Sequence, residues 1–322
     1  DGFEPAEGVF ADASLRAAIA AEFGPGATFS PTHLESYAAC PFRFFLERVL
    51  GAQPLVEFEA ETDCMGRGLL AHAALAALHR RTNEALGRPG LPLELDEVAY
   101  AAAMEAALAE ALGDEPDDPI EQSLREVNRR VVKQWLDGYR EQLESYVKSW
   151  SDWDAPPATE RIEACFGSRA VADAHEPADP AAAREAFECL VDGSPVRLTG
   201  RIDRIDTALQ LPLYAIAAAE LLLADRNPVP WAAGYWHVPE KGFSPRKALR
   251  MYGPADDGVE LLANWEQIRL DLPEIVGALI RGIRRGEFPV FNEDERCTNS
   301  CPFNTLCRIG QIRALEKTWQ PT

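Results

Sequence analysis

The sequence lacks long hydrophobic runs, a leader pattern and an ATP-motor motif. No window approaches about 18 consecutive apolar residues, which excludes a membrane-spanning helix of ordinary length. The opening stretch DGFEPAEGVFADASL has neither a basic nor an apolar segment, so we expect no secretory signal peptide. No segment matches the Walker A pattern G-x-x-x-x-G-K-[ST], so an ATP-driven motor would have to lie elsewhere. We therefore expect a cytoplasmic protein.

Basic residues are also scarce. The chain has 32 Lys and Arg against 52 Asp and Glu, a net charge of −20, which argues against broad non-specific binding to nucleic acid or anionic membranes. Local basic clusters remain, and they are either solvated helix faces or the lining of a groove for phosphates. They are Arg80 with Arg81, Arg129 with Arg130, the residues Lys241, Arg246, Lys247 and Arg250, and the residues Arg281, Arg284 and Arg285.

The amino-acid composition is typical of a globular protein. Of 322 residues, 47% are hydrophobic and 26% charged, so a core can form and wholesale disorder is excluded. The length allows one large domain or two small ones. We expect residues 1–29 to be a linker or N-terminal extension, about 66–151 a helical lobe, about 158–290 an α/β core, and 291–322 a cysteine-rich tail.

Helix signals are clear in the first half. Ser30 before Pro31 predicts a helix start, Pro41 should restart that helix, and Gly51 should end it. Further helices are expected over 66–86, from the cap Asp96 to Gly113, and as one long helix over 119–150.

The second half mixes strands and helices. Alternation and β-branched residues predict strands in RIEACF, EAFECLV, PVRLTGRIDRID, WAAGYWHV and RKALRMYG. LPLYAIAAAELLLAD reads as a helix, and so does the whole stretch from VELLANWEQ to RRGEF, bent at Pro273. The sequence thus predicts a mixed α/β fold with a helical lobe.

Seven cysteines in a chain without a secretion signal indicate reduced thiols or metal ligands. Cys297, Cys301 and Cys307 lie in CTNSCPFNTLC, and Cys40 lies far earlier in YAACPFRFF. Three close thiols can hold one face of a metal centre and a remote fourth can complete it, and four thiolates without histidine fit an iron–sulfur cluster. The alternatives are zinc, although its usual two short ligand pairs are absent, and unliganded buried thiols.

Five segments, in this order, carry a family resemblance: SPTHLESYAACPFRFFLERVLG, GRGLLAH, GRIDRID, QLPLY and GEFPVFNEDERCTNSCPFNTLC. Together they resemble the RecB-family PD-(D/E)xK nuclease domain of the iron–sulfur type, in particular the C-terminal nuclease domain of AddB-like helicase–nuclease subunits. One departure is that three residues separate Cys297 from Cys301, where the family usually has two.

The resemblance implies a restriction-endonuclease-like core, in which helices flank a central mixed sheet. It also implies a [4Fe–4S] cluster on Cys40, Cys297, Cys301 and Cys307 that staples the N- and C-terminal regions. By analogy with a disulfide that closes a very long loop, this staple would stabilise the fold by about 5 kcal/mol. The implied function is a Mg²⁺- or Mn²⁺-dependent DNA exonuclease in end processing and double-strand-break repair, associated with the nucleoid and a helicase partner.

The resemblance also assigns site residues. His72 of GRGLLAH and Asp203 of GRID would be ligands of the divalent metal, which prefers hard oxygen donors and open positions for water and phosphate. Gln210 and Tyr214 match a Q-x-x-x-Y motif that would orient the site or hold the DNA backbone. Without the resemblance, His72 reads as a core histidine and Asp203 as an ion-pair partner of Arg201 or Arg204.

Two further residues bear on the site. Glu163, on the first strand of the core, is a candidate extra ligand. His79, two turns after His72, is expected to face phosphate or solvent beside Arg80 and Arg81.

One expected motif is missing. The family places a strand with an acid-x-Lys triplet after GRIDRID, but here Asp206-Thr207-Ala208 leads directly into Leu209-Gln210. Either the natural polypeptide has a stretch between Ala208 and Leu209 that the printed chain lacks, or the chain is an inactive nuclease fold that binds or guides single-stranded DNA or scaffolds a partner. We favour the first, because loss of a central strand exposes sheet edges.

Overall fold

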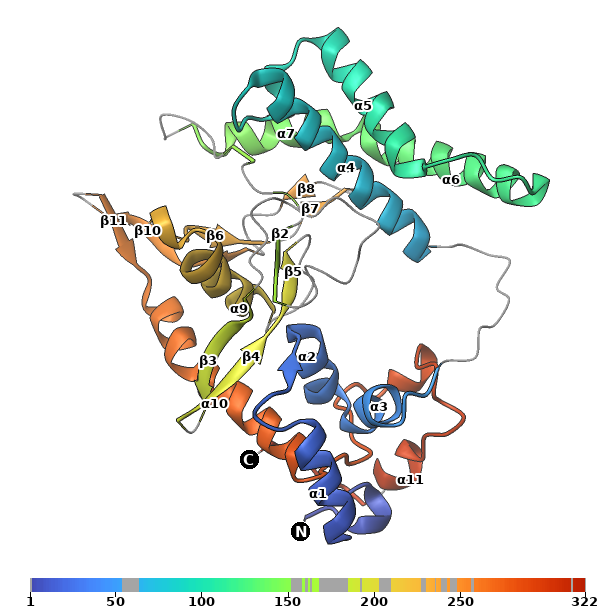
Figure 1. Ribbon diagram of the computed structural model, residues 1–322, viewed down its shortest axis with the longest axis vertical. Coiled ribbons are helices and arrows are strands. Elements are labelled where there is room, and N and C mark those ends of the chain that lie inside the picture. Colours follow the sequence, from blue (N-terminus) through green and yellow to red (C-terminus); the bar gives the residue numbers. More distant parts are fainter. Residues whose placement is uncertain are drawn as a thin grey trace.

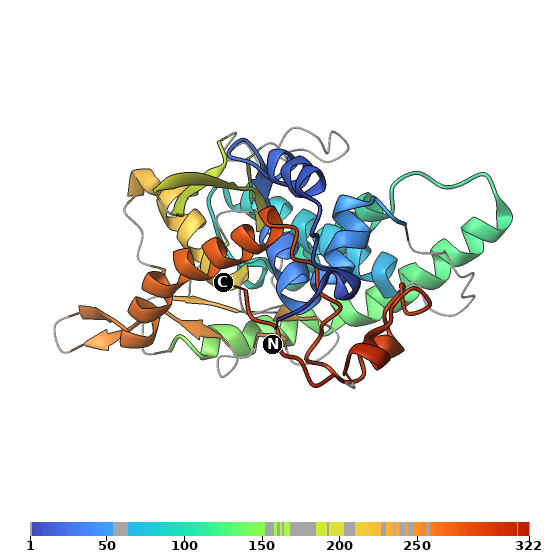
Figure 2. The same cartoon turned by 90° about the horizontal axis from the view of Figure 1, so that it is seen from below.

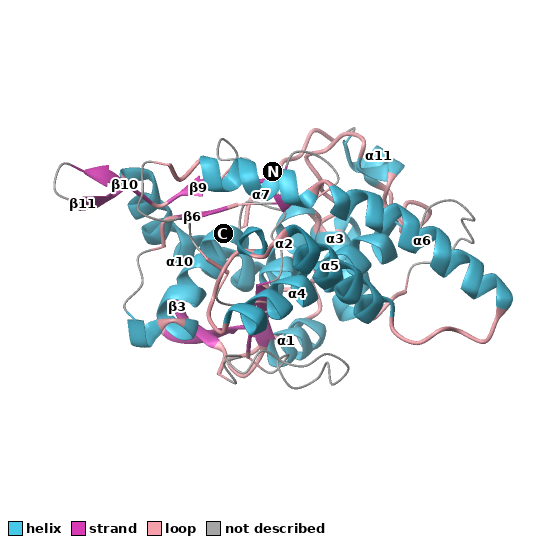
Figure 3. Ribbon diagram, turned by 90° about the horizontal axis from the view of Figure 1, so that it is seen from above, coloured by secondary structure: helices cyan, strands magenta, loops and turns pink. Residues whose placement is uncertain are grey.

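The computed structural model describes most of the chain and is shown in Figure 1. The described residues are 2–53, 64–151, 158–159, 162, 164–167, 185–191, 193–202, 210–226, 230–234, 236–238, 242–243, 248–255, 258–313 and 315–321. Helices are the more abundant elements in the described part of the chain, and the strands are short (Figure 3).

The buried hydrophobic side chains of the described residues form two clusters. A small mixed sheet contributes to the first cluster. In it, β1 (Thr28–Phe29) is parallel to β4 (Ser194–Leu198), and β4 is antiparallel to β3 (Phe187–Val191). A separate antiparallel pair joins β2 (Ala164–Phe166) to β5 (Gly200–Ile202). The helices that bury side chains in this cluster are α1 (Ala13–Glu22), α2 (Pro31–Ala39), α3 (Pro41–Phe44), α9 (Gln210–Ala217) and α10 (Ala263–Arg284). The predicted mixed α/β class is therefore confirmed.

The second hydrophobic cluster is helical. It is formed by α4 (Cys64–Leu86), α5 (Glu97–Leu112), α6 (Pro119–Asp137) and α7 (Tyr139–Lys148), together with Val238. The four helices lie together at one end of the molecule, away from α1 to α3 (Figure 1). Small side chains on α4, among them the fully buried Ala74, allow α5 to pack closely against it.

Short antiparallel pairs complete the described strands. These pairs are β6 (Ala232–Ala233) with β9 (Leu249–Arg250), β7 (Trp236–His237) with β8 (Gly242–Phe243), and β10 (Tyr252–Ala255) with β11 (Gly258–Leu261). The last helix is α11 (Ile309–Arg313).

The predicted helix starts in the first half are confirmed. The Ser30 hydroxyl accepts a hydrogen bond from the His33 backbone N–H at 3.2 Å and caps α2. Pro41 opens α3, which continues into a π-helical turn over Phe45–Val49, and Gly51 follows with φ 64°. The side chain of Asp96 caps α5 as predicted.

Residues 1–29 include the helix α1, whose Ile19 is buried in the first cluster. Two expectations about element boundaries are wrong. The single helix expected over 119–150 is divided at Gly138 into α6 and α7. The first three residues of the predicted C-terminal helix, VEL, belong instead to β11, which pairs with β10 and begins at Gly258 with φ 135°.

Aromatic rings around Phe288 join the two ends of the chain. Phe10, Tyr37, Phe44 and Phe45 all have ring centroids within 6.2 Å of the Phe288 centroid, and the Phe288 side chain is 1% exposed. Both termini lie on the same side of the molecule (Figure 2). They are further tied by an ion pair of 2.7 Å between Lys317 Nζ and Glu7 Oε2.

The backbone of the N-terminal segment approaches this cluster closely. The backbone N–H of Phe288 donates to the Gly8 carbonyl at 2.9 Å. Gly8 has φ 108°, and a Cβ there would lie 2.2 Å from the Phe288 carbonyl oxygen. Glycine is thus required at this position both by conformation and by space.

We predict that the stability of the protein falls between pH 6.5 and pH 4 because of His79. Its Nε2 lies 2.7 Å from the Tyr139 hydroxyl oxygen inside the helical cluster, and burial lowers the pKa of His79 from 6.5 to about 4. In this window the unfolded chain binds a proton that the folded chain does not, so the free energy of unfolding decreases as pH falls, by about 3 kcal/mol in total.

Chemical denaturation at several pH values measures this effect. His79→Phe should flatten the slope between pH 4 and 6.5, while His33→Phe, in the first turn of α2, should leave it unchanged. Parallel slopes for the wild type and His79→Phe would contradict the prediction.

Candidate active site and cysteine cavity

The first three residues of the GRID motif, Gly200–Ile202, form the paired strand β5. In the β2–β5 pair, Ala164 lies opposite Ile202 and Phe166 opposite Gly200. Asp203 follows Ile202 directly in the sequence, and Glu163 directly precedes Ala164. Both acidic residues lie outside the described residues, so their predicted roles as metal ligands stay predictions.

Tyr214 contacts the same strand. It is 6% exposed, and its ring meets Phe166 edge to face with centroids 6.0 Å apart. A Cβ on Gly200 would lie 2.6 Å from Tyr214 Cε1 and 3.0 Å from Phe166 Cζ. The structure therefore brings the tyrosine of QLPLY against the glycine of GRID, and glycine is what allows the ring to lie on the strand.

The expected helix of the Q-x-x-x-Y motif is present. α9 begins at Gln210, so Gln210 and Tyr214 are four residues apart and share one helical face. The side chain of Gln210 is outside the described part of the structure. The helix continues through a π-helical turn over Ala218–Leu222, a feature often found near functional sites.

His72 lies on α4 and is half-buried, one residue after the buried Ala71. Across the described ranges, no group of three or more histidine, cysteine, aspartate or glutamate side chains is arranged to hold a metal ion. The expectation for His79 is wrong: it is buried against Tyr139 rather than facing phosphate or solvent. Its place on the inner face of α4 is consistent with its contact with Tyr139, at the start of α7.

The four predicted cluster cysteines line one cavity. Cys40, Cys297, Cys301 and Cys307 all border a space of about 730 Å³ between the start of α3 and the C-terminal segment. Burial, together with the neighbouring thiols, raises the pKa of Cys40 to about 11. Burial likewise raises the pKa of Cys307. The raised pKa values favour the protonated forms of Cys40 and Cys307, so a metal centre would have to displace their protons.

The position of Cys40 follows from the proline after it. A residue before proline is excluded from the helical region by steric clash, and Cys40 adopts φ −154° and ψ 93° between α2 and α3. Its carbonyl accepts a hydrogen bond from the Phe44 backbone N–H at 3.1 Å, which starts α3.

Arg313 holds the loop that carries the other three cysteines. Its guanidinium donates to the Glu295 carbonyl at 2.8 Å and to Cys297 Sγ at 3.4 Å, and it also reaches the carbonyl oxygens of Asn292 and Asp294. The Asn304 side chain donates to the Thr298 carbonyl at 3.5 Å. The loop is therefore tied by side-chain bonds to its own backbone.

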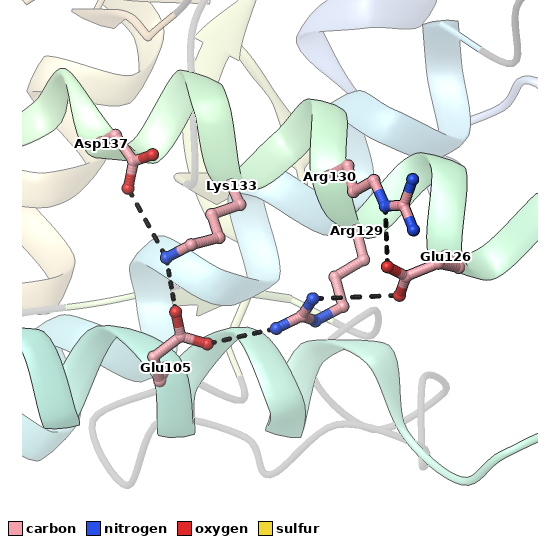
Figure 4. A network of polar contacts seen from close by, with 6 residues as sticks. All are labelled: Glu105, Glu126, Arg129, Arg130, Lys133 and Asp137. Atoms are coloured by element: carbon pink, nitrogen blue, oxygen red, sulfur yellow. Dashed lines mark hydrogen bonds and ion pairs between the residues drawn. The ribbon is translucent and has the colours of Figure 1, made fainter.

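Two of the basic clusters pair with acidic side chains. Arg129, Arg130 and Lys133 on α6 pair with Glu105, Glu126 and Asp137 in the network of Figure 4, three cations with three acids. Arg80 and Arg81 share the single carboxylate of Glu110, at 3.0 and 2.7 Å. Surface pairs of this kind contribute little stability, and the balanced α6 network is the weaker candidate for a phosphate groove. Lys241, Arg246 and Lys247 lie outside the described residues.

Sequence reasoning missed a second cavity, of about 600 Å³, beside α7. It is lined by aromatic side chains including Trp150, Trp231 and Trp236. The signal available in the sequence was the clustering of tryptophan and tyrosine around positions 139–150 and 231–236.

Comparison with protein families identifies the class. Residues 28–209 and 205–308 match the PD-(D/E)XK nuclease superfamily. The match covers most of the chain, and the chain belongs to this superfamily. Its members are nucleases, so nuclease activity on DNA is the activity that the family implies. The two matched segments meet at 205–209, where the acid-x-Lys triplet is missing from the sequence.

The curated proteins searched include no match to this chain. None of the described helices is long and apolar enough to cross a membrane.

We predict that Gly200→Ala lowers the free energy of unfolding by about 1–3 kcal/mol, because the added methyl group overlaps the buried rings of Tyr214 and Phe166. Urea denaturation measures the change. Gly68→Ala is the matched control: Gly68 lies within α4, and a Cβ added there would meet no atom within 4 Å, so alanine should raise stability by about 0.5–1 kcal/mol. Equal effects of the two substitutions would show that Gly200 is not a contact point.

Proposed function

We propose that this chain is a metal-dependent DNA exonuclease domain that works with a helicase partner in DNA end processing and double-strand-break repair. The observation that carries the proposal is the superfamily match, whose first segment contains the GRID motif and whose second contains QLPLY. The packing of Tyr214 on Gly200 supports it, because these two motifs then belong to one site. The exonuclease mode, the helicase partner and a nucleoid location rest on the sequence resemblance.

In the proposed site, Asp203 and His72 hold Mg²⁺ or Mn²⁺. The described register ends with Ala164 opposite Ile202, and the next residues along the two strands are Glu163 and Asp203. A pair of carboxylates suits a hard cation better than one does, so Glu163 is our candidate for a further ligand. When bound, the cation polarises the scissile phosphate and lowers the pKa of a water.

The residues around the metal have separate tasks in this proposal. Gln210 and Tyr214 orient the site or the DNA backbone from α9, with the ring of Tyr214 fixed by its contact with β5. The buried side of this site is apolar, because Phe166 lies behind Tyr214. A preorganised arrangement of this kind lowers the barrier by positioning.

We further propose that Cys40, Cys297, Cys301 and Cys307 hold a [4Fe–4S] cluster. The donor set fits: four thiols border one cavity, and no histidine is among its described lining residues. Four thiolates are the usual ligands of such a cluster. The cluster would join α2 and α3 to the C-terminal segment as a staple.

A competing function has its own observation. The acid-x-Lys triplet is absent from the chain, and the family match divides at 205–209. If the natural polypeptide also lacks this triplet, the chain is an inactive nuclease-fold module that binds or guides single-stranded DNA or scaffolds a partner. The junction of Ala208 with Leu209 lies outside the described residues.

We predict that the natural polypeptide degrades labelled single-stranded DNA with Mg²⁺, and that Asp203→Ala abolishes cleavage while DNA binding persists. The reason is that Asp203 would hold the metal, whereas backbone phosphate contacts supply most of the binding. Gel assays of cleavage and anisotropy of binding measure the two properties. Cleavage that survives Asp203→Ala would remove this residue from the site.

The same assay separates the two functions. A chain in which Ala208 is joined directly to Leu209 should be inactive even with Mn²⁺, because no lysine then orients the water. If the natural polypeptide has this junction and is inactive, the competing function holds. Activity of that chain that is lost in Glu163→Gln would assign the missing role to Glu163.

We predict that anaerobically purified protein is brown and contains about four irons per chain. Cys40→Ser should lower the melting temperature far more than Cys165→Ser, since Cys165 lies on β2, outside the cysteine cavity. Iron analysis, visible absorption and calorimetry measure these properties. A colourless protein with one zinc would refute the cluster, and equal melting temperatures would refute the staple.

A further inference from the structure

The cavity beside α7 has an aromatic lining. Its walls come from α4, α7 and the strands β6 to β9, and it has a volume of about 600 Å³, within the usual range for small-ligand sites. Among the described residues, the aromatic side chains that border it are Tyr139, Tyr146, Trp150, Trp231, Trp236 and Phe243.

Most of these rings are not part of the closed core. Tyr146, Trp150, Trp231, Trp236 and Phe243 are all only half-buried, while neighbouring ring centroids lie 5.4–6.4 Å apart. Clefts lined mainly by aromatic and apolar side chains are typical of ligand-binding sites. They offer several flat faces on which another ring can stack.

The wall of the cavity is held in place by Gln142. The Trp236 indole N–H donates to Gln142 Oε1 at 2.6 Å, and Gln142 Nε2 donates to the Val238 carbonyl at 2.8 Å. Gly242 has φ 72°, and a Cβ there would lie 2.9 Å from the Gln142 side chain. The ring of Trp236 is therefore fixed before any ligand arrives, which reduces the entropy lost on binding.

The described lining carries one cationic side chain. The Arg250 guanidinium lies 5.7 Å from the Trp231 ring centroid, and among the described residues that border the cavity none is acidic. His79 also borders it, and His79 Nδ1 is a buried atom without a hydrogen-bond partner in the described structure. The described lining thus combines aromatic rings, the Arg250 guanidinium and, at the inner wall, the His79 Nδ1 atom.

We propose that this cavity is a nucleobase-binding subsite, which holds one unpaired base of a single DNA strand between its aromatic rings while Arg250 contacts the adjoining phosphate. Stacking on aromatic side chains and an accompanying arginine are how proteins bind single strands without reading their sequence. The subsite is separate from the GRID and QLPLY residues, and it would hold the strand that the nuclease cuts. The choice of DNA as the ligand rests on the proposed function.

The test compares two oligonucleotides in EDTA, so that cleavage plays no part. One is a short thymidine strand and the other is the same length of abasic deoxyribose-phosphate strand. Wild-type protein should bind the base-bearing strand about tenfold more tightly, the fold-change expected of one stacked base. Trp231→Leu should bind both strands equally, and Trp231→Phe, which keeps a ring, should restore the preference.

Matched controls separate stacking from folding. Trp135→Leu replaces a half-buried tryptophan on α6, outside the cavity, and should keep the preference. Arg250→Gln should weaken binding of both strands alike and reduce its salt dependence, whereas Arg269→Gln, which removes the partner of Glu220, should not. Thermal melts identify any variant that is unfolded. If Trp231→Leu is unfolded, the strand preference is judged from Trp231→Phe instead.

Each outcome decides a separate point. A wild-type protein without preference for the base-bearing strand, or a preference unchanged in Trp231→Leu, overturns the subsite. If DNA is cleaved with Mg²⁺ while that preference is absent, only the subsite fails. If the preference is present and depends on Trp231 but no cleavage occurs, the subsite stands and the nuclease proposal fails.

Discussion

The burial of Phe288 is the constraint on which the arrangement of the chain ends depends. Rings from the N-terminal segment, α2 and α3 surround it, and the Tyr37 hydroxyl donates to the Glu287 carbonyl at 2.7 Å. This packing brings Cys40, at the end of α2, and the C-terminal cysteine loop to one cavity. The apolar core therefore assembles the proposed ligand set, and the proposed cluster would reinforce a contact that already exists.

Much of the fold follows from local signals in the sequence. Caps and prolines fixed the beginnings of α2, α3 and α5 because their side chains act within one turn of the backbone. α1 was missed because it buries only Ile19, which leaves no hydrophobic periodicity to detect. β11 was missed because VELL suits a helix as well as a strand, and the turn at Gly258 decided between them.

The candidate site could be predicted from the sequence only in part. The sequence indicated Gln210 and Tyr214 as one helical face, but the contact of Tyr214 with Gly200 depends on tertiary packing between segments that no local pattern links. His79 was misjudged because Arg80 and Arg81 beside it suggested a polar face, whereas those arginines reach outward to Glu110 and the imidazole packs inward. The aromatic cavity joins α7 to distant strands, so the sequence alone could only show that tryptophans were numerous there.

The hydrogen bonds of Arg313 have a consequence for the proposed ligand loop. One guanidinium binds the carbonyl oxygens of Asn292, Asp294 and Glu295. A single side chain on α11 therefore restrains three carbonyl positions before Cys297, and it reduces the number of conformations open to that backbone. The shape of the loop that carries Cys297 thus depends on a residue that is not itself one of the proposed ligands.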